Sequence, residues 1–590
     1  MIEDSLEVGG WMLELTTWML QLGVSPASAC ARVAMPRAAV HPAGTMRPRT
    51  LSGTIVDVVN REIFAGTVEW ADGVIRAIHR DRRALGPGLI MPGFVDAHIH
   101  IESSLLPPAE FARLAVVHGT VATVSDPHEI ANVLGGAGVD YMIRDGARTP
   151  FKFNFGAPSC VPATAFETAG ATLDAGAVDK MLDRPEIRYL SEVMNFPGVL
   201  AGDPGMLAKI DSAHRRGKQV DGHAPGLHGA QAAAYAAAGI STDHECFTLA
   251  EARDKLAAGM RILIREGSAA RNFDALAPLL KTDASHCMFC CDDLHPDRLV
   301  LHHIDHHVRR ALNLGADRLD VLACASVHAV QHYGLDVGLL EPGDPADFIV
   351  VDNWSRFRVQ RTYLRGELVA SGGRTRLPRQ PSRIVNRFRA KPRKAAEFAV
   401  EAGEGKLNVI EAIDGQLVTR HVRMDATIAD GLAVADPKRD LLKITVVNRY
   451  APRAPIAVGF VKGFGLRRGA IASSVAHDSH NIVAVGADDT SLATAVNLVI
   501  VGRGGLSVAE GARGSVLPLP IAGLMSDLDG RTVARRYAAL DARAKRLGSR
   551  LGAPFMTLSF MALLVIPDLK LSDRGLFSGS KWAFEPVFGE

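Results

Sequence analysis

The chain has 590 residues, of which 47% are hydrophobic and 22% are charged, and its formal net charge at pH 7 is +2. This length and composition predict a multidomain globular protein, and the near balance of charges indicates neither a nucleic-acid-binding stripe nor a polybasic membrane patch. The seven cysteines lack disulfide-scaffold spacing, which is typical of a reducing compartment, so we expect a cytoplasmic location without a nucleic-acid partner.

Residues 1–50 are predicted to form an extension outside the compact protein. Their apolar run 10–24 resembles a signal-peptide core, but acidic residues such as Glu3 and Glu7 precede it where a signal peptide needs positive charge. Glu14 interrupts this run, which is also too short to span a bilayer. We expect an amphipathic helix or a loose extension here, and no membrane association for the chain.

Two β-rich segments, 51–90 and 341–380, lie on either side of a central region. Alternating runs such as 54–59 are separated by turn signals, and the run 348–352 has the same strand character. We predict that the two segments join in one small β-sandwich domain, which flanks a domain formed by residues 91–340.

Strand and helix patterns alternate eight times within residues 91–340. The segments between the strands are rich in alanine and compatible with helix, for example 204–217 and 229–238. This alternation predicts a (β/α)8 TIM-like barrel, an α/β fold whose chemistry lies at the carboxyl ends of its strands. The predicted strands and their ends fall within residues 94–102, 119–129, 151–159, 187–193, 219–223, 240–245, 261–267 and 286–293.

The strand ends carry histidines and carboxylates. His98 and His100 stand one residue apart at the end of the first strand run, and with Glu102 they can share one face because side chains alternate along a strand. Such a pair of histidines alone is as typical of a packed core as of a metal site. Later strand ends add residues of the same kind, which core packing does not explain. Mixed nitrogen and oxygen ligands predict a two-metal site formed by His98, His100, Glu192, His223, His244 and Asp292.

Two further groups near the strand ends leave alternatives open. Asp126, His128 and Glu129 follow the second strand, and they either hold substrate or an extra metal or form a hydrogen-bonded turn network. The segment 265–272, rich in glycine, serine and arginine, either binds substrate or caps a helix.

Cys287 and Cys290 have the CxxC spacing of a structural zinc half-site. No second Cys/His pair with matching spacing follows, so core packing of the eighth strand is the prediction for both cysteines.

Residues 381–590 are predicted to form a further, mixed α/β domain. It opens with a basic patch, 383–394, that is predicted to be a linker or a solvated helix. His477, Asp478 and His480 suggest a metal site or a hydrolase triad, but the nucleophile elbow G-x-S-x-G is absent. We expect a packing or oligomer role for this domain, with lining of the active-site mouth as the alternative.

The ordered motifs resemble the amidohydrolase superfamily and, within it, the bacterial adenine deaminases. The resemblance covers the chain after residue 51 and is carried by residues 92–104, 126–133, 157–162, 192–195, 222–224, 243–245, 265–272, 292–297, 342–347 and 474–481. It implies that His98, His100 and Asp292 bind one divalent metal and that His223 and His244 bind the other. Glu192 would bridge the two metals, where many superfamily members use a carboxylated lysine.

The resemblance also implies an activity, the deamination of adenine to hypoxanthine and ammonia in purine salvage. The metals, Mn2+ first and Fe2+ or Zn2+ as alternatives, would lower the pKa of a shared water toward roughly 7, and the resulting hydroxide would attack C6 of adenine. Asp292 would accept the water proton, and Glu102 would protonate the ring nitrogen and then the leaving ammonia. A homodimer is the expected assembly.

Two other functions compete with this one. An amidohydrolase barrel supports many substrates through loop variation, so another aminopurine or a cyclic amide is the alternative substrate. An assembly protein without catalysis would have lost metal ligands, and all six are present in this chain.

Overall fold

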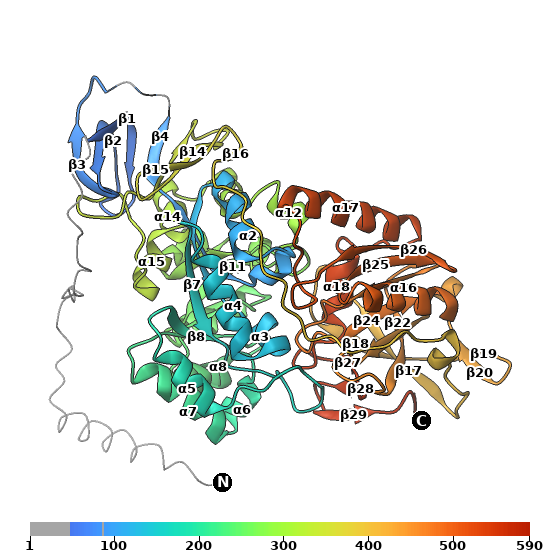
Figure 1. The fold of residues 1–590 in the computed structure, drawn as a ribbon. Coiled ribbons are helices and arrows are strands. Elements are labelled where there is room, and N and C mark those ends of the chain that lie inside the picture. Colours follow the sequence, from blue (N-terminus) through green and yellow to red (C-terminus); the bar gives the residue numbers. More distant parts are fainter. Residues whose placement is uncertain (1–47, 85, 87, 590) are drawn as a thin grey trace, which may run out of the picture. The chain divides into compact units, whose positions relative to one another are not determined.

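The computed structural model describes residues 48–589 except 85 and 87 (Figure 1). The predicted extension 1–50 therefore lies almost entirely outside the described residues. Among the residues that are described, no helix is long and apolar enough to cross a membrane.

The two β-rich segments form one eight-stranded sheet beside the barrel. Antiparallel pairing of β4 with β13 joins the segments, so the predicted union of the two is confirmed. They share one hydrogen-bonded sheet, where the sequence predicted a sandwich. The sheet encloses its own core, where the Trp70 ring lies 5.2 Å from that of Phe348 and 5.7 Å from that of Tyr363. In sheet order the strands are β16 (Arg374–Thr375), β15 (Glu367–Ser371), β14 (Val359–Leu364), β13 (Phe348–Val351), β4 (Leu89–Pro92), β1 (Arg49–Asp57), β2 (Glu62–Ala71) and β3 (Val74–Arg80).

The central domain is a parallel eight-stranded barrel, as predicted. Its strands are short and buried, and β12 returns to β5 through backbone bonds between Asp292 and the two residues His98 and His100. Closure of the barrel therefore fixes three predicted ligands relative to one another. The strands are β5 (Phe94–Ile99), β6 (Thr120–Ser125), β7 (Lys152–Ala157), β8 (Ile187–Val193), β9 (Val220–Gly222), β10 (Thr242–Asp243), β11 (Arg261–Arg265) and β12 (Cys287–Cys290).

Helices follow the barrel strands. The predicted helix at 204–217 is α7, which begins with Pro204 at a position that needs no amide donor, while the Asp203 carboxylate accepts from the Met206 amide at 2.7 Å. The helices are α2 (Pro108–Ala115), α3 (His128–Leu134), α4 (Gly136–Gly146), α5 (Ala175–Leu182), α6 (Phe196–Leu200), α7 (Pro204–His214), α8 (Gly229–Ala237), α9 (Leu249–Ala257), α10 (Phe273–Leu276), α11 (Leu279–Thr282), α12 (Pro296–Leu299), α13 (Ile304–Asn313), α14 (Arg318–Cys324) and α15 (Val327–Tyr333). The 3-10 helices are η1 (Ile101–Ser104), η2 (Val116–His118) and η3 (Ala284–His286).

The cysteines of the CxxC sequence lie in β12. Cys287 and Cys290 are both buried and free, as core packing predicts. All the cysteines within the described part of the chain are buried free thiols, and burial raises the pKa of the Cys287 thiol to about 12. These cysteines are accordingly protonated and unreactive at neutral pH.

The remaining residues form the predicted mixed α/β domain (Figure 1). The basic patch 383–394 contains no helix or strand, so the linker interpretation is confirmed and the solvated helix is wrong. Helix α16 (Asp489–Val501) buries Leu492 and Val496 against the main sheet. The other helices are α17 (Gly530–Arg546), α18 (Pro554–Phe560), η4 (Ala395–Phe398) and η5 (Pro437–Arg439).

The main sheet of this domain has nine strands. Its order is β18 (Thr419–Met424), β17 (Lys406–Ala412), β22 (Ile456–Lys462), β21 (Leu442–Val447), β24 (Ile482–Gly486), β23 (Ala470–Ser473), β25 (Gly505–Glu510) and β26 (Arg513–Pro518), with β30 (Phe588–Gly589) on β17. Two smaller sheets are β19 (Thr427–Ala429) with β20 (Leu432–Val434), and β27 (Leu569–Ser572) with β28 (Gly575–Ser578) and β29 (Ala583–Glu585).

Candidate metal centre

The barrel brings the six predicted ligands together at the carboxyl ends of its strands, all of them buried. The His100 Nε2 atom lies 3.1 Å from Asp292 Oδ1, and the His98 Nε2 atom lies 3.7 Å from the same oxygen. The two Nε2 atoms are 3.2 Å apart. Two imidazoles and one carboxylate therefore lie close together, and their role as ligands of a first metal stays a prediction.

Glu192 lies between this group and the other two histidines. Its Oε2 atom is 2.6 Å from His223 Nδ1 and 3.2 Å from His244 Nε2, while its Oε1 atom is 3.3 Å from His100 Nε2. Each oxygen of the carboxylate thus faces a different set of histidines. The predicted bridging role of Glu192 is compatible with this arrangement and stays a prediction.

The donor set fits divalent cations. The ligand atoms of His98, His244 and Asp292 lie within 4.8 Å of one another, and so do those of Glu192, His223 and His244. Burial, reinforced by the neighbouring histidines, holds the pKa of His98 well below its usual range, so its ring is neutral. Burial opposes ionisation of Glu192, but the charge of His223 outweighs it and holds the pKa of that carboxyl well below its usual range. Neutral imidazole and ionised carboxylate are the forms that bind metal. Burial opposes the charged form of His223, but Glu192 and Glu245 outweigh it and raise its pKa to about 9, so a metal bound there would displace a proton from this ring.

Arg265 forms an ion pair with the predicted ligand Asp292. The guanidinium is fully buried, and its Nη1 atom donates to both Asp292 and Glu245 while Nη2 donates to Glu245 at 3.1 Å. Burial opposes ionisation of Asp292, but the positive charge of Arg265 holds the pKa of that carboxyl well below its usual range. This arginine is the chemically important residue of the segment 265–272, and the sequence motif had not singled it out.

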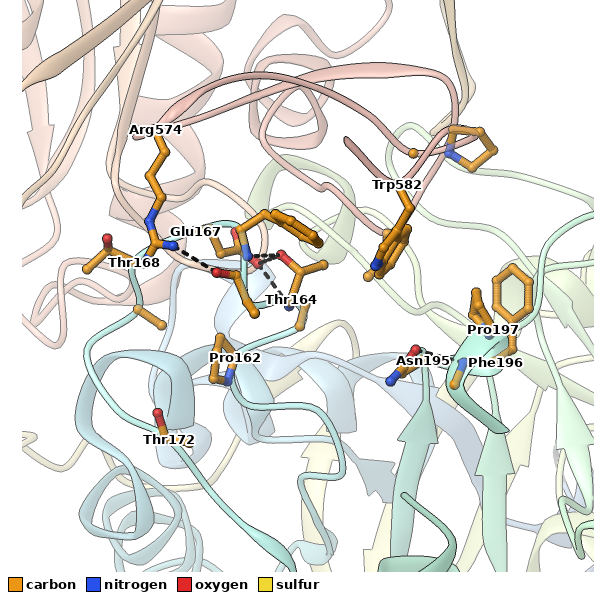
Figure 2. Close-up of a pocket in the computed structure, with 18 of the residues that line it drawn as sticks. Pro162, Thr164, Glu167, Thr168, Thr172, Asn195, Phe196, Pro197, Arg574 and Trp582 are labelled. Atoms are coloured by element: carbon orange, nitrogen blue, oxygen red, sulfur yellow. Dashed lines mark hydrogen bonds between the residues drawn. The ribbon is translucent and has the colours of Figure 1, made fainter. Parts of the chain in front are cut away.

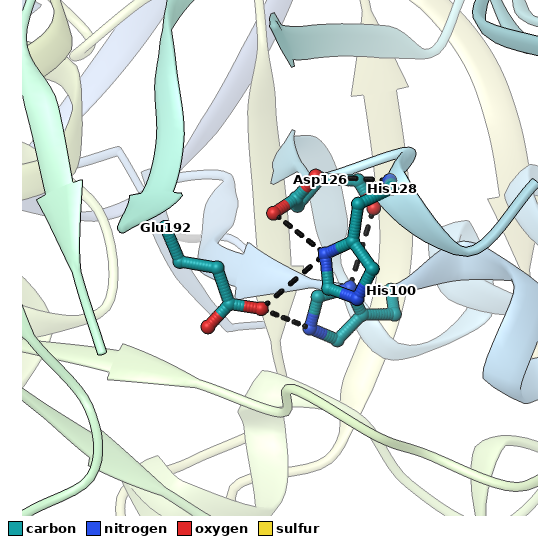
Figure 3. Close-up of side chains that lie close together, drawn as sticks. All are labelled: His100, Asp126, His128 and Glu192. Atoms are coloured by element: carbon teal, nitrogen blue, oxygen red, sulfur yellow. Dashed lines mark hydrogen bonds and ion pairs between the residues drawn. The ribbon is translucent and has the colours of Figure 1, made fainter. Parts of the chain in front are cut away.

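Of the three residues after β6, His128 reaches the centre directly (Figure 3). Its Nδ1 atom lies 3.4 Å from the same Glu192 oxygen that faces His100, and 2.9 Å from Asp126 Oδ2. Asp126 also accepts from the His128 amide at 3.0 Å, which is the turn network that the sequence left as an alternative. The turn network is therefore present. The four side chains His100, Asp126, His128 and Glu192 also form a group that could hold a metal ion, so the extra-metal interpretation stays a prediction.

The C-terminal domain completes the wall of the centre. Glu129, at the start of α3, pairs with His477 through one oxygen and with His480 through the other. Asp478 Oδ1 lies 3.6 Å from His128 Nε2. These contacts match the alternative prediction for this domain, which was lining of the site. A packing or oligomer role alone does not account for them.

Glu102 is held by the backbone of α3, and its predicted role as a proton carrier stays a prediction. The backbone turns into η1 directly after β5, so the alternation that would place Glu102 beside His98 and His100 ends before it. Its Oε1 atom accepts from the Ile130 amide at 3.2 Å, and burial raises the pKa of its carboxyl to about 7. Glu129, rather than Glu102, lines the space beside the predicted ligands.

This space, called the inner cavity below, has a volume of about 20 Å3. Barrel residues His100, Glu129 and Asp293 line it, and apolar side chains cover it from the C-terminal domain. These apolar side chains are Leu417, Phe560 and Leu563. No pattern in the sequence connects these residues, all more than 300 positions from His98, with its surroundings.

The fold and the site define an amidohydrolase: residues 89–369 match the amidohydrolase family, and residues 416–583 match the adenine deaminase C-terminal domain. Proteins named adenine deaminase align along most of the chain. That of Salinibacter ruber is 58% identical over 541 residues, which are 91% of this chain and 99% of the relative. That of Sulfurovum sp. is 55% identical over 90% of this chain and 98% of its own length, and that of Methanosarcina mazei is 48% identical over 91% and 99%. The chain belongs to the adenine deaminase family.

Proposed function

We propose that this chain catalyses the hydrolytic deamination of adenine to hypoxanthine and ammonia. The observation that carries the proposal is the set of six convergent ligands in a chain 58% identical to a protein named adenine deaminase. Another aminopurine or a cyclic amide remains the alternative substrate, because such ligands activate water whatever the substrate is.

The proposed cofactor is a pair of divalent ions, Mn2+ first and Fe2+ or Zn2+ as alternatives. His98, His100 and Asp292 would hold one ion, and His223 and His244 the other, with Glu192 shared; the distances given above support this assignment. When bound, the ions would supply a water acidic enough to act as a nucleophile at neutral pH.

Asp292 and Glu129 are the proposed proton carriers. Asp292 is ionised beside Arg265, and we assign to it the acceptance of the water proton. Glu129 lines the inner cavity between two histidines of the C-terminal domain; burial opposes its ionisation, but the charges of His477 and His480 hold the pKa of its carboxyl well below the usual range. The proton of the pair therefore sits on His477, and we assign to the Glu129–His477 ion pair the delivery of a proton to the purine ring and the leaving amine, after which the proton taken up by Asp292 replaces it. Glu102, which accepts from the Ile130 amide, is the alternative proton carrier, because burial raises the pKa of its carboxyl to about 7.

The apolar cover over the inner cavity would exclude bulk water. Exclusion strengthens the electrostatic interactions between the purine and the buried carboxylates. A homodimer and a cytoplasmic location remain proposals as well; the buried free cysteines support a reducing compartment.

The test is metal-dependent turnover. Protein stripped of metal is reconstituted with Mn2+, and ammonia release and the loss of adenine absorbance are measured beside adenosine, guanine and a cyclic amide. Adenine turnover that returns only with metal, near two ions per chain, is the expected result. Metal bound at that level with adenine inert would reject the proposed substrate in favour of the alternative class.

A further inference from the structure

A much larger cavity lies beside the inner one. The inner cavity, at about 20 Å3, has room for roughly one water molecule. The second cavity, called the outer cavity, measures about 1180 Å3, and small-molecule sites typically span roughly 300–1,000 Å3. A purine base therefore fits the outer cavity as it stands, whereas its entry into the inner cavity requires movement of a wall.

The two cavities share their walls at two places. After β8, Met194 lines the inner cavity and the next residue, Asn195, lines the outer one. After α18, Leu563 lines the inner cavity and Val565 lines the outer one. At each of these places, only one or two residues of chain separate the cavities. Residues 194–195 belong to the barrel, and residues 563–565 belong to the C-terminal domain.

The buried carboxyl group of Glu167 lies in the outer cavity and interacts with a charged residue of the inner cavity. Glu167 lines the outer cavity with 3% of its surface exposed, and its Oε1 atom accepts from the Thr164 amide and hydroxyl at 3.3 and 3.4 Å (Figure 2). Its Oε2 atom has no hydrogen-bond partner among the described residues. Burial, together with the charge of Asp478 in the inner cavity, raises the pKa of Glu167 well above its usual range. Glu167 therefore offers a protonated carboxyl that could donate to a ring nitrogen.

Aromatic rings supply flat apolar surfaces at the same place. Trp582, from the C-terminal domain, and Phe166, from the loop after β7, both line the outer cavity, and their ring centres are 6.0 Å apart with planes at 90°. Figure 2 shows Trp582 and Arg574 on one side of the cavity and the barrel residues from Pro162 to Pro197 on the other. Aromatic faces beside a buried hydrogen-bonding carboxyl suit a planar heterocycle.

We propose that the outer cavity is a binding site for free purine bases, and that substrate and product pass between it and the metal centre through the partition at 194–195 and 563–565. The inference rests on the proposed function, which makes a purine base the substrate. It adds a second site for the same class of molecule, and it assigns stacking to Trp582 and hydrogen bonding to Glu167.

The first test is turnover of adenine by the metal-loaded full chain. Trp582→Ala removes the stacking surface and is expected to lower kcat/KM about tenfold, since stacking a base on an aromatic ring contributes a factor of that order. Trp582→Phe should restore most of it. Phe584→Ala is the matched control, because its ring lies 5.7 Å from Phe166 in the same aromatic cluster but does not line the cavity; kcat/KM should stay within about twofold of the wild-type value.

The second test measures binding directly. Unsubstituted purine, which lacks the amino group to be removed, is titrated calorimetrically into the metal-loaded protein. Two purines per wild-type chain and one per chain of Ala165→Trp are expected, because Ala165 is an exposed residue lining the outer cavity, where an indole would fill it. A single site in the wild-type protein, together with unchanged kcat/KM in Trp582→Ala, would overturn the inference. Wild-type protein inert toward adenine would instead reject the proposed function.

Discussion

Glu129→Gln should nearly abolish turnover, whereas Glu102→Gln should leave most of it. A positioned proton carrier contributes roughly 10²–10⁴-fold, which is about 2.7–5.4 kcal/mol of activation free energy. Glutamine at position 129 cannot carry a proton, and it also leaves His477, whose pKa Glu129 raises to about 9 against the effect of burial, without its ion pair. At position 102, the glutamine oxygen can still accept from the Ile130 amide, so the loss should stay near threefold, about 0.5–1 kcal/mol.

The assay is kcat at saturating adenine with metal content measured on the same samples. Both variants should retain wild-type metal content, because neither Glu102 nor Glu129 is among the six proposed ligands. A kcat for Glu129→Gln within threefold of wild type would remove Glu129 from proton transfer. A hundredfold loss in Glu102→Gln with full metal content would return that role to Glu102 and refute the geometric argument.

Three further predictions concern the support of the centre. Arg265→Met leaves the buried carboxylates Asp292 and Glu245 without their cation, so metal titrations should show roughly 10–100-fold weaker binding. Arg265→Lys should have an intermediate affinity. Equal metal affinity in the wild type and both variants would contradict this prediction. Metal at a concentration 100 times its Kd should add roughly 2.7 kcal/mol to the free energy of unfolding, so chelation should lower the melting temperature and metal addition should restore it. An unchanged melting temperature in protein verified as metal-free would show that metal binding does not stabilise the fold. Burial lowers the pKa of Lys570 to about 7 in the folded chain. Between pH 7 and the normal lysine pKa, the unfolded chain therefore still binds this proton, whereas the folded chain has released it. The free energy of unfolding should accordingly rise with pH above pH 7, by at most about 1.4 kcal/mol per pH unit. Denaturant titrations at pH 7, 8 and 9 should show that Lys570→Met loses this increment; identical slopes would count against it.

The barrel could be predicted because its determinants are local. Each strand is a short, largely buried run, and every run except β7 has a histidine or carboxylate at or just after its end, at the carboxyl edge of the sheet. The wrong extension of the strand to Glu102 has the same origin. The prediction extended strand alternation past Ile99, but the chain enters η1 at Ile101, and the turn redirects the Glu102 side chain toward α3.

Contacts between distant segments could not be predicted in the same way. Glu129 and His477 are 348 positions apart, and neither residue type nor spacing relates them. The sequence did mark both as unusual, one in a cluster after the second strand and the other in a histidine-rich loop. Only the packing of the C-terminal domain on the barrel places them in one wall.

This division between the domains bears on how adenine would be selected. The six proposed ligands all come from the barrel, and a ligand set of this kind activates water for many different substrates. The second domain adds a wall to the inner cavity opposite these residues, through Leu417, His477, Asp478 and Phe560. Since shape and unpaired polar groups decide which molecule can be desolvated in a site, selection of adenine should depend on this second wall more than on the metal ligands. Changes in that wall are therefore expected to alter the substrate range while leaving metal content intact.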